Sequence, residues 1–121
     1  MPDYDAFIAR VKELSTIESI GGLLAWDQET MMPSKGGALR AESLAFLSGL
    51  AHSRLVDPAM GELLEKLEDA DIDEGQAANV REVRHAYDKA TKLPAELVEE
   101  IARHKSQSLQ VWQEARAEDD F

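Results

Sequence analysis

The chain has 121 residues, 44% of them hydrophobic, which is enough for one packed core and too few for two domains. Its 24 acidic residues against 13 Lys and Arg give a net charge of −11, which disfavours nucleic acid and anionic membranes as partners. The absence of cysteine excludes disulfides, thiolate catalysis and Cys-based zinc sites. No apolar run reaches the roughly 18 residues of a membrane span, and the acidic start lacks a signal-peptide pattern, so we expect a cytoplasmic protein.

Hydrophobic periodicity predicts an all-α fold, an antiparallel assembly of four to five helices without a strand. The first helix is predicted to begin near Asp3, as its N-cap, and to end before Pro33. Its apolar residues recur every three or four positions, at Tyr4, Phe7, Ile8, Val11, Leu14, Ile17, Ile20 and Leu24. Beyond Ile20 the apolar character widens, which predicts burial on most sides. Gly21 and Gly22 are predicted to admit another helix closely or to kink this one.

The next two helices are separated by an Asp-Pro pair. The second helix is predicted to run from about Ser34 or Leu39 to His52, and its apolar face is Leu44, Leu47, Leu50 and Ala51. Asp57 is the expected N-cap of the third helix, with Pro58 at its first position. The apolar face of this third helix is Met60, Leu63, Leu64 and Leu67.

The last two helices begin at a capping box and at a proline. Asp73 and Gln76 predict the capping box, and the fourth helix then presents Ala77, Val80, Val83, Tyr87 and Ala90. Pro94 is predicted at the first position of the fifth helix, whose apolar side is Leu97, Ile101, Ser108, Trp112 and Ala115. This helix lacks a C-terminal stop signal, and acids and Phe121 follow it, so we expect a piece of a longer protein or a short homologue.

The residues that could carry metal or nucleophilic chemistry do not form a known pattern. His52, His85 and His104 are not spaced as His-Glu-x-x-His, and a catalytic zinc needs about three protein ligands. Glu82 and His85 copy half of a di-iron signature, which needs a second such pair. A nucleophile elbow and a phosphate loop are both missing from the sequence. We therefore expect neither a catalytic residue nor a metal site in this chain.

A more distinctive pattern lies at the end of the first helix. Residues 23–33 read LLAWDQETMMP, and a loose Ser-Lys-Gly-Gly run and then Arg40-Ala41-Glu42 follow. This stretch resembles the N-terminal region of the family M32 metallocarboxypeptidases, the Carboxypeptidase Taq type, which carry roughly L-x-x-W-D-x-x-T-x-M-P, a glycine-containing turn and an Arg-Ala pair. The resemblance continues through residues 87–98 and 112–121. The motif residues are Trp26, Asp27, Gln28, Thr30, Met32, Pro33, Arg40 and Trp112.

The resemblance implies a single helical domain over residues 1–121 that forms a wall or lid of the substrate groove of a zincin-related carboxypeptidase. The complete enzyme would remove C-terminal residues from peptides with zinc or another divalent metal, held by a His-Glu-x-x-His helix that this sequence lacks. The missing catalytic part would then be the partner of an inactive chain, and the resemblance also implies a homo-oligomer. The alternative is a free-standing helical interaction or regulatory module without catalysis.

Two interpretations of the Trp-Asp-Gln motif stay open from the sequence. In the first, Asp27 or Gln28 contacts substrate in the complete enzyme. In the second, Trp26 fills the core and Asp27 forms a buried pair with an arginine, Arg40 before Arg84, so that Asp27→Ala costs about 3–5 kcal/mol. Trp112 is expected in the core as well.

The distribution of apolar residues also predicts self-association. The first helix beyond Ile20 and the C-terminal end of the fifth helix, with Trp112 and Phe121, are expected to expose a contiguous apolar patch. Because the net charge of −11 opposes association, the oligomer is expected to tighten as salt rises.

Overall fold

The computed structural model describes residues 1–119, so Asp120 and Phe121 lie outside the described residues. Five α-helices and one 3-10 turn make up this part of the chain, which contains no strand, and the predicted all-α class is confirmed. The elements are α1 Pro2–Thr30, η1 Ser34–Gly36, α2 Gly37–Leu55, α3 Pro58–Glu68, α4 Glu74–Ala90 and α5 Ala95–Ala117.

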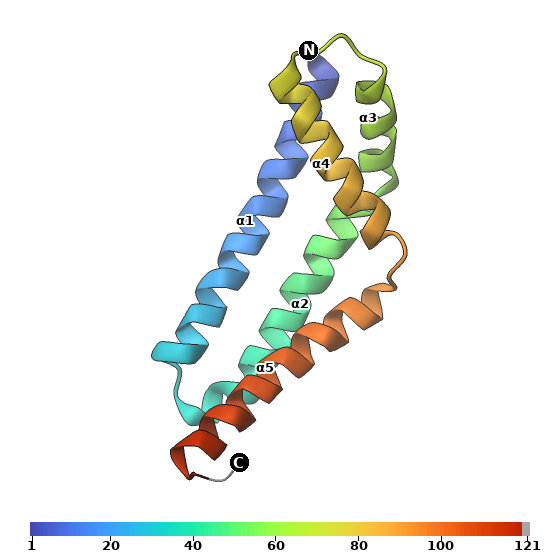
Figure 1. The fold of residues 1–121 in the computed structure, drawn as a ribbon. Helices are drawn as coiled ribbons and strands as arrows, with labels where there is room; N and C mark the ends of the chain where they lie inside the picture. The colour runs from blue at the N-terminus through green and yellow to red at the C-terminus, as the bar shows by residue number, and fades with distance from the viewer. Residues whose placement is uncertain (120–121) are drawn as a thin grey trace.

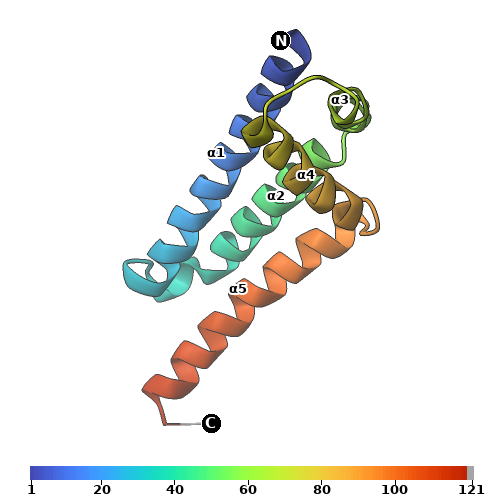
Figure 2. The same cartoon turned by 45° about the horizontal axis from the view of Figure 1, so that its top comes forward.

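The helices form an elongated assembly built on the antiparallel pair α1 and α2 (Figure 1). The N-terminal half of α1 lies beside α3 and α4, at the same end of the molecule as the N-terminus. After α4 the chain continues toward the other end of the molecule as α5, which packs along α2, as the turned view also shows (Figure 2). Within residues 1–119, no helix is both long and apolar enough to cross a membrane.

The main hydrophobic core lies at the end of the molecule where α1, α3 and α4 meet. It consists of Phe7, Met60, Leu64, Leu67 and Val80, each at most 2% exposed. All five belong to the predicted apolar faces, which are confirmed for α3 and for the first half of α1. Burial of side chains of this size from α1, α3 and α4 ties the three helices together.

The ends of the helices follow the cap signals in most places. The carboxylate of Asp57 accepts from the Ala59 amide at 2.9 Å, and the capping box of Asp73 and Gln76 is formed, as predicted. The start of α1 was predicted wrongly, because Pro2 occupies the first turn and Met1 is the N-cap. Pro94 is the N-cap of α5 and not its first residue, and α2 continues past His52 to Leu55.

The buried face of α2 differs from the predicted leucine face. Leu44, Leu47, Leu50 and Ala51 are half-buried, whereas the buried residues are mainly small, namely Gly37, Ala41, Ala45, Gly49 and His52. The four small ones recur every four positions from Gly37 to Gly49, so they form a shallow stripe along α2. An added Cβ at Gly49 would come within 2.8 Å of the Glu99 Cγ, which shows how closely α5 approaches.

The face of α5 was also predicted wrongly. Leu97, Ile101, Ser108 and Trp112 are exposed, and Trp112 is 51% exposed, outside the core. The helix packs instead through its polar side, where Ser106 is buried and Glu99, Ala102 and Gln110 are half-buried. The reason is the stripe of small residues on α2. It brings the two helix backbones close together, so only small or hydrogen-bonded side chains of α5 fit between them, and a tryptophan does not.

The second half of α1 is exposed on much of its surface, contrary to the prediction of burial on most sides. Leu23 is 64% exposed and Trp26 is 57% exposed, so Trp26 does not fill the core. Gly21 and Gly22 lie within one continuous helix, and an added Cβ at either would meet no atom within 4 Å. The close approach proposed for these glycines is therefore wrong, and the close approaches occur at Gly37 and Gly49 of α2 and at Gly61 of α3.

Candidate functional site

Polar side chains from α1, α2 and α5 meet below the hydrophobic core, and we call this set the polar junction. It consists of Asp27 and Gln28 of α1, Arg40 and Glu42 of α2, and Arg103 and Ser106 of α5. Neighbouring positions on a helix point about 100° apart. Asp27 and Gln28 can therefore reach different helices, and so can Arg40 and Glu42, which are two positions and about 200° apart.

Asp27 and Arg40 join α1 to α2. The Arg40 Nη2 donates to Asp27 Oδ2 at 2.8 Å, and the Arg40 Nη1 donates to the Leu24 carbonyl at 2.7 Å. The predicted arginine partner of Asp27 is thus confirmed, and the second choice, Arg84, pairs with Glu68 and Asp88. The Asp27 side chain is 34% exposed, so this is a half-buried pair.

Replacing Asp27 by alanine is expected to lower the free energy of unfolding by about 1–2 kcal/mol. This is less than the sequence-based range, because Arg40 stays hydrogen-bonded to Leu24 and the pair is partly solvated. Urea denaturation of the variant measures the change. Asp5→Ala, which alters an exposed acid in the first turn, is the control and should change stability by less than about 0.5 kcal/mol. Equal losses for both variants would contradict the role of Asp27.

Gln28 and Ser106 join α1 to α5 in the buried centre of the junction. Gln28 Nε2 donates to the Ser106 carbonyl at 2.9 Å, and Ser106 Oγ donates to Gln28 Oε1 at 3.0 Å. Gln28 is 5% exposed. Sequence analysis did not identify Ser106, although one signal existed. Gln28 continues the stripe of the buried Ile17 and the half-buried Leu24, and a buried polar residue on such a stripe requires a partner.

Glu42 and Arg103 join α2 to α5 at the rim of the junction. Arg103 Nε donates to Glu42 Oε1 at 2.6 Å, and its Nη2 donates to Oε2 at 3.1 Å, so the pair is bidentate. Hydrogen bonding from the Arg103 guanidinium lowers the pKa of Glu42, and the Glu42 carboxylate raises the pKa of Arg103. Glu42 is the acid of the Arg-Ala-Glu segment, which therefore contacts both neighbouring helices of α2.

Acidification is expected to remove the contribution of the Glu42–Arg103 pair to the stability of the folded chain. The pKa of Glu42 is lowered in the folded state, so its stabilisation is complete above its unfolded-state pKa and is lost as pH falls from about 5 through the lowered value. Glu42→Gln should therefore flatten the fall of the melting temperature between neutral and acidic pH. Thermal melts followed by circular dichroism measure both profiles, with the exposed Glu65→Gln as control. Profiles for Glu42→Gln and wild type that run parallel would contradict the assignment.

The remaining motif residues shape the turn between α1 and α2. The Thr30 hydroxyl donates to the Trp26 carbonyl at 2.8 Å, and the Pro33 carbonyl accepts from the Gly36 amide at 2.9 Å. Met32 is half-buried beside Gly36. Gln110 of α5 donates to the Ser34 carbonyl at 2.9 Å and covers Gly37, where an added Cβ would overlap its amide. The motif therefore fixes the turn and its contact with α5.

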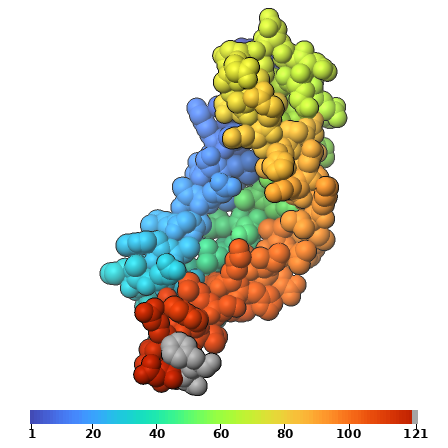
Figure 3. All heavy atoms as spheres, viewed as in Figure 1, coloured from blue at the N-terminus to red at the C-terminus, as the bar shows by residue number. Residues whose placement is uncertain are grey.

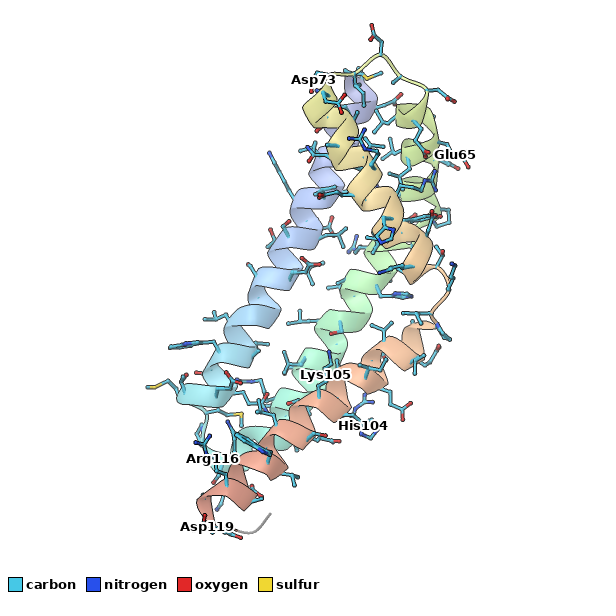
Figure 4. All side chains as sticks on the ribbon, in the orientation of Figure 1. Glu65, Asp73, His104, Lys105, Arg116 and Asp119 are labelled. Atoms are coloured by element: carbon cyan, nitrogen blue, oxygen red, sulfur yellow. The ribbon has the colours of Figure 1, made fainter. Side chains whose placement is uncertain are left out.

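Trp112 and the histidines lie outside the junction. The Arg116 guanidinium stacks over the Trp112 ring at 5.3 Å, on the exposed side of α5. His104 projects from α5 beside Glu100, 3.5 Å away (Figure 4). Across residues 1–119, no group of three or more His, Cys, Asp or Glu side chains could hold a metal ion, so the residues present do not fit a catalytic metal.

A groove runs beside the junction between α1 and α2. The space-filling view shows the hollow between α1 and α5 with α2 at its floor (Figure 3). The groove between α1 and α2 has a volume of about 340 Å³ and is lined by these two helices alone, mostly by small or aliphatic side chains, with Gly21, Ala25, Leu44, Ser48 and Ala51 among the residues. Such a lining can contact a bound apolar group, but it has few polar groups that could fix the orientation of a ligand.

The sequence is similar to carboxypeptidases over almost its whole length. Thermostable carboxypeptidase 1 of Thermus thermophilus is 40% identical over 98% of this chain, and its namesake from Pyrococcus furiosus is 30% identical over 94%. Carboxypeptidase 1 of Bacillus subtilis is 27% identical over 95%. The chain spans about a quarter of these relatives, 23–24% of their length.

The family match covers every element of the polar junction. Residues 6–121 match the profile of the Carboxypeptidase Taq (M32) metallopeptidases, from the second turn of α1 through α5. The stretch of residues 23–33 with Arg40, on which the resemblance rested, lies inside that match. The chain belongs to the Carboxypeptidase Taq (M32) family of metallopeptidases.

Proposed function

We propose that this chain provides a helical wall, or lid, of the substrate groove in a zinc-dependent carboxypeptidase that removes C-terminal residues from peptides, and that the chain alone is not catalytic. The observation that carries the proposal is the family match over residues 6–121 in a sequence without His-Glu-x-x-His. The relatives that bear the name carboxypeptidase are about four times as long.

The polar junction supports the role of a wall. Each pair of helices among α1, α2 and α5 is joined by at least one hydrogen-bonded pair, at 2.6–3.0 Å. A groove that positions a substrate needs walls held by such supporting contacts. Within this proposal the metal is held by residues outside the chain, where it would polarise the scissile carbonyl and activate water.

The first test is hydrolysis by the purified chain. We expect no release of C-terminal amino acids from peptides, with or without added zinc or cobalt, because the ligand set and general base are missing from the sequence. The Thermus thermophilus carboxypeptidase serves as the positive control. Zinc-dependent release by the purified chain would contradict the proposal.

The second test is a chimaera in which this chain replaces the matching quarter of the Thermus thermophilus enzyme. We expect the chimaera to be an active carboxypeptidase. The same enzyme without that quarter should be inactive, because one wall of the groove is missing. A folded but inactive chimaera would contradict the proposal and favour a helical interaction module without catalysis.

A further inference from the structure

Helix α5 carries its apolar residues on the side that faces away from the rest of the chain. Its inner side packs through the hydrogen-bonded Ser106 and Arg103, whereas Leu97, Ile101 and Trp112 are 41–51% exposed on the outer side. Leu97 lies nine residues before Ser106, and 100° per residue places the two on opposite sides of the helix. Because helices of globular proteins bury their apolar side, this orientation predicts a second neighbour on the outer side of α5.

The outer side of α5 is one continuous surface, which we call the α5 outer face. It borders an open depression of about 1010 Å³ and includes Leu97, Ile101, His104, Lys105, Ser108 and Trp112. At 1.5 Å per residue the face is about 22 Å long, which matches the side of another helix of ordinary length. Figure 2 shows α5 along one edge of the assembly, so a neighbour can approach this face from outside.

The charges on the α5 outer face favour an acidic group on the neighbour. Glu100 is 3.5 Å from His104, and Arg116 stacks over the Trp112 ring at 5.3 Å. Within residues 1–119, Lys105 forms no ion pair. A cation that is covered by a neighbour needs an opposite charge. The surface that fits is therefore aliphatic, with a carboxylate beside Lys105.

A helix fits this face better than an extended peptide does. A helix pairs its own backbone N–H and C=O groups, whereas a peptide segment laid on the face would need partners for them. Between Ile101 and Trp112 the uncharged polar side chain of the face is Ser108, which offers one hydroxyl. The α5 outer face is thus suited to helix packing and poorly suited to holding a peptide substrate.

The carboxypeptidase relatives supply the source of such a helix. The chain spans 23–24% of their length, so about three quarters of an enzyme of that size lies outside it. The chain matches the N-terminal region of the family, and the match includes all of α5. In such an enzyme the remaining part of the protein follows α5 directly.

We infer that the α5 outer face is the seat of the remaining part of the enzyme, which packs a helix with an aliphatic side and an acid against it. Helix α5 is then a central helix, with a polar layer toward α2 and an apolar layer toward that remaining part. The inference rests on the proposed function for the identity of the partner. It adds that this side of the wall is closed to substrate.

Hydroxyl-radical labelling read by mass spectrometry tests the inference on the chimaera with the Thermus thermophilus enzyme. Trp112 is 51% exposed in the 121-residue chain and should be labelled strongly there. In the chimaera its labelling should fall at least about fivefold, because packed interiors exclude water. His85, which is exposed on α4, is the internal reference and should be labelled equally in both proteins. Equal labelling of Trp112 in both proteins would overturn the inference.

A substitution at the centre of the face gives a second readout. Ile101→Lys should hardly change the unfolding of the 121-residue chain, where Ile101 is 44% exposed. In the chimaera it should speed thermal unfolding, followed by circular dichroism, at least about tenfold, because it buries an unpaired cation. Leu39→Lys, at a 75% exposed position of α2, is the matched control and should change neither protein.

The outcomes separate this inference from the proposed function. A folded but inactive chimaera with Trp112 covered would contradict the proposed function alone, and an active chimaera with Trp112 exposed would overturn this inference alone. If Ile101→Lys raised the KM of the chimaera for a peptide without changing its unfolding rate, the face would belong to the substrate and the inference would fail. Equal acceleration of unfolding by Ile101→Lys and Leu39→Lys would also overturn it.

Discussion

Replacing Leu64 by alanine is expected to lower the free energy of unfolding by about 3–5 kcal/mol. Leu64 is fully buried in the cluster formed with Phe7, Met60, Leu67 and Val80. Two contributions add up to this loss. The removed methyl groups no longer contribute the free energy of their transfer out of water, and the surrounding side chains do not relax enough to fill the cavity. Urea denaturation followed by circular dichroism measures it.

Leu97→Ala is the matched control for Leu64→Ala. Leu97 is 41% exposed on α5, outside the cluster, so the same chemical change should cost less than about 1 kcal/mol. Comparable losses for the two variants would mean that α3 does not form the core that ties α1 to α4.

Replacing Gln28 by alanine is expected to cost about 2–3 kcal/mol. The change removes a buried amide, its hydrogen bond to the Ser106 carbonyl and the acceptor of the Ser106 hydroxyl. An unsatisfied buried polar group loses the hydration it would have in the unfolded chain and gains nothing in return. Gln107→Ala, which alters an exposed glutamine next to Ser106, should have almost no effect.

A double-mutant cycle with Ser106→Ala separates this pair from simple loss of volume. If the two side chains act through their mutual hydrogen bonds, the double variant should cost less than the sum of the single variants by about 1 kcal/mol or more. Strictly additive losses would show that Gln28 stabilises the junction by packing alone.

The sequence predicted the local structure well, because its signals are local. The five helices, the Asp57 cap and the Asp73 capping box depend on residues within a few turns of each other, and all were confirmed. The pair of Asp27 and Arg40 was also foreseen, because a half-buried acid on an apolar helix requires a cation.

The sequence did not predict correctly which side of α2, of α5 and of the second half of α1 is buried. A stripe of leucines, or a tryptophan, does not indicate which helix it packs against, nor whether it is buried within this chain. In this chain Trp26, Phe46 and Trp112 remain exposed, and small residues of α2 face hydrogen-bonded residues of α5. Side-chain size misled the prediction, because close helix contact selects the smallest residues, and in this chain several of the largest ones stay exposed.

The contact between α2 and α5 has a consequence for how the molecule opens. The largest fully buried side chains are Phe7, Met60, Leu64 and Leu67, and none belongs to α2 or α5. Separating α5 from α2 therefore exposes small or half-buried side chains and none of these large ones, and a subglobal opening that exposes less apolar area requires less free energy than global unfolding. Amide hydrogens of α5 should therefore exchange with solvent deuterium through partial openings, while those of α3 stay protected. The chain would then open as two cooperative units that share α1.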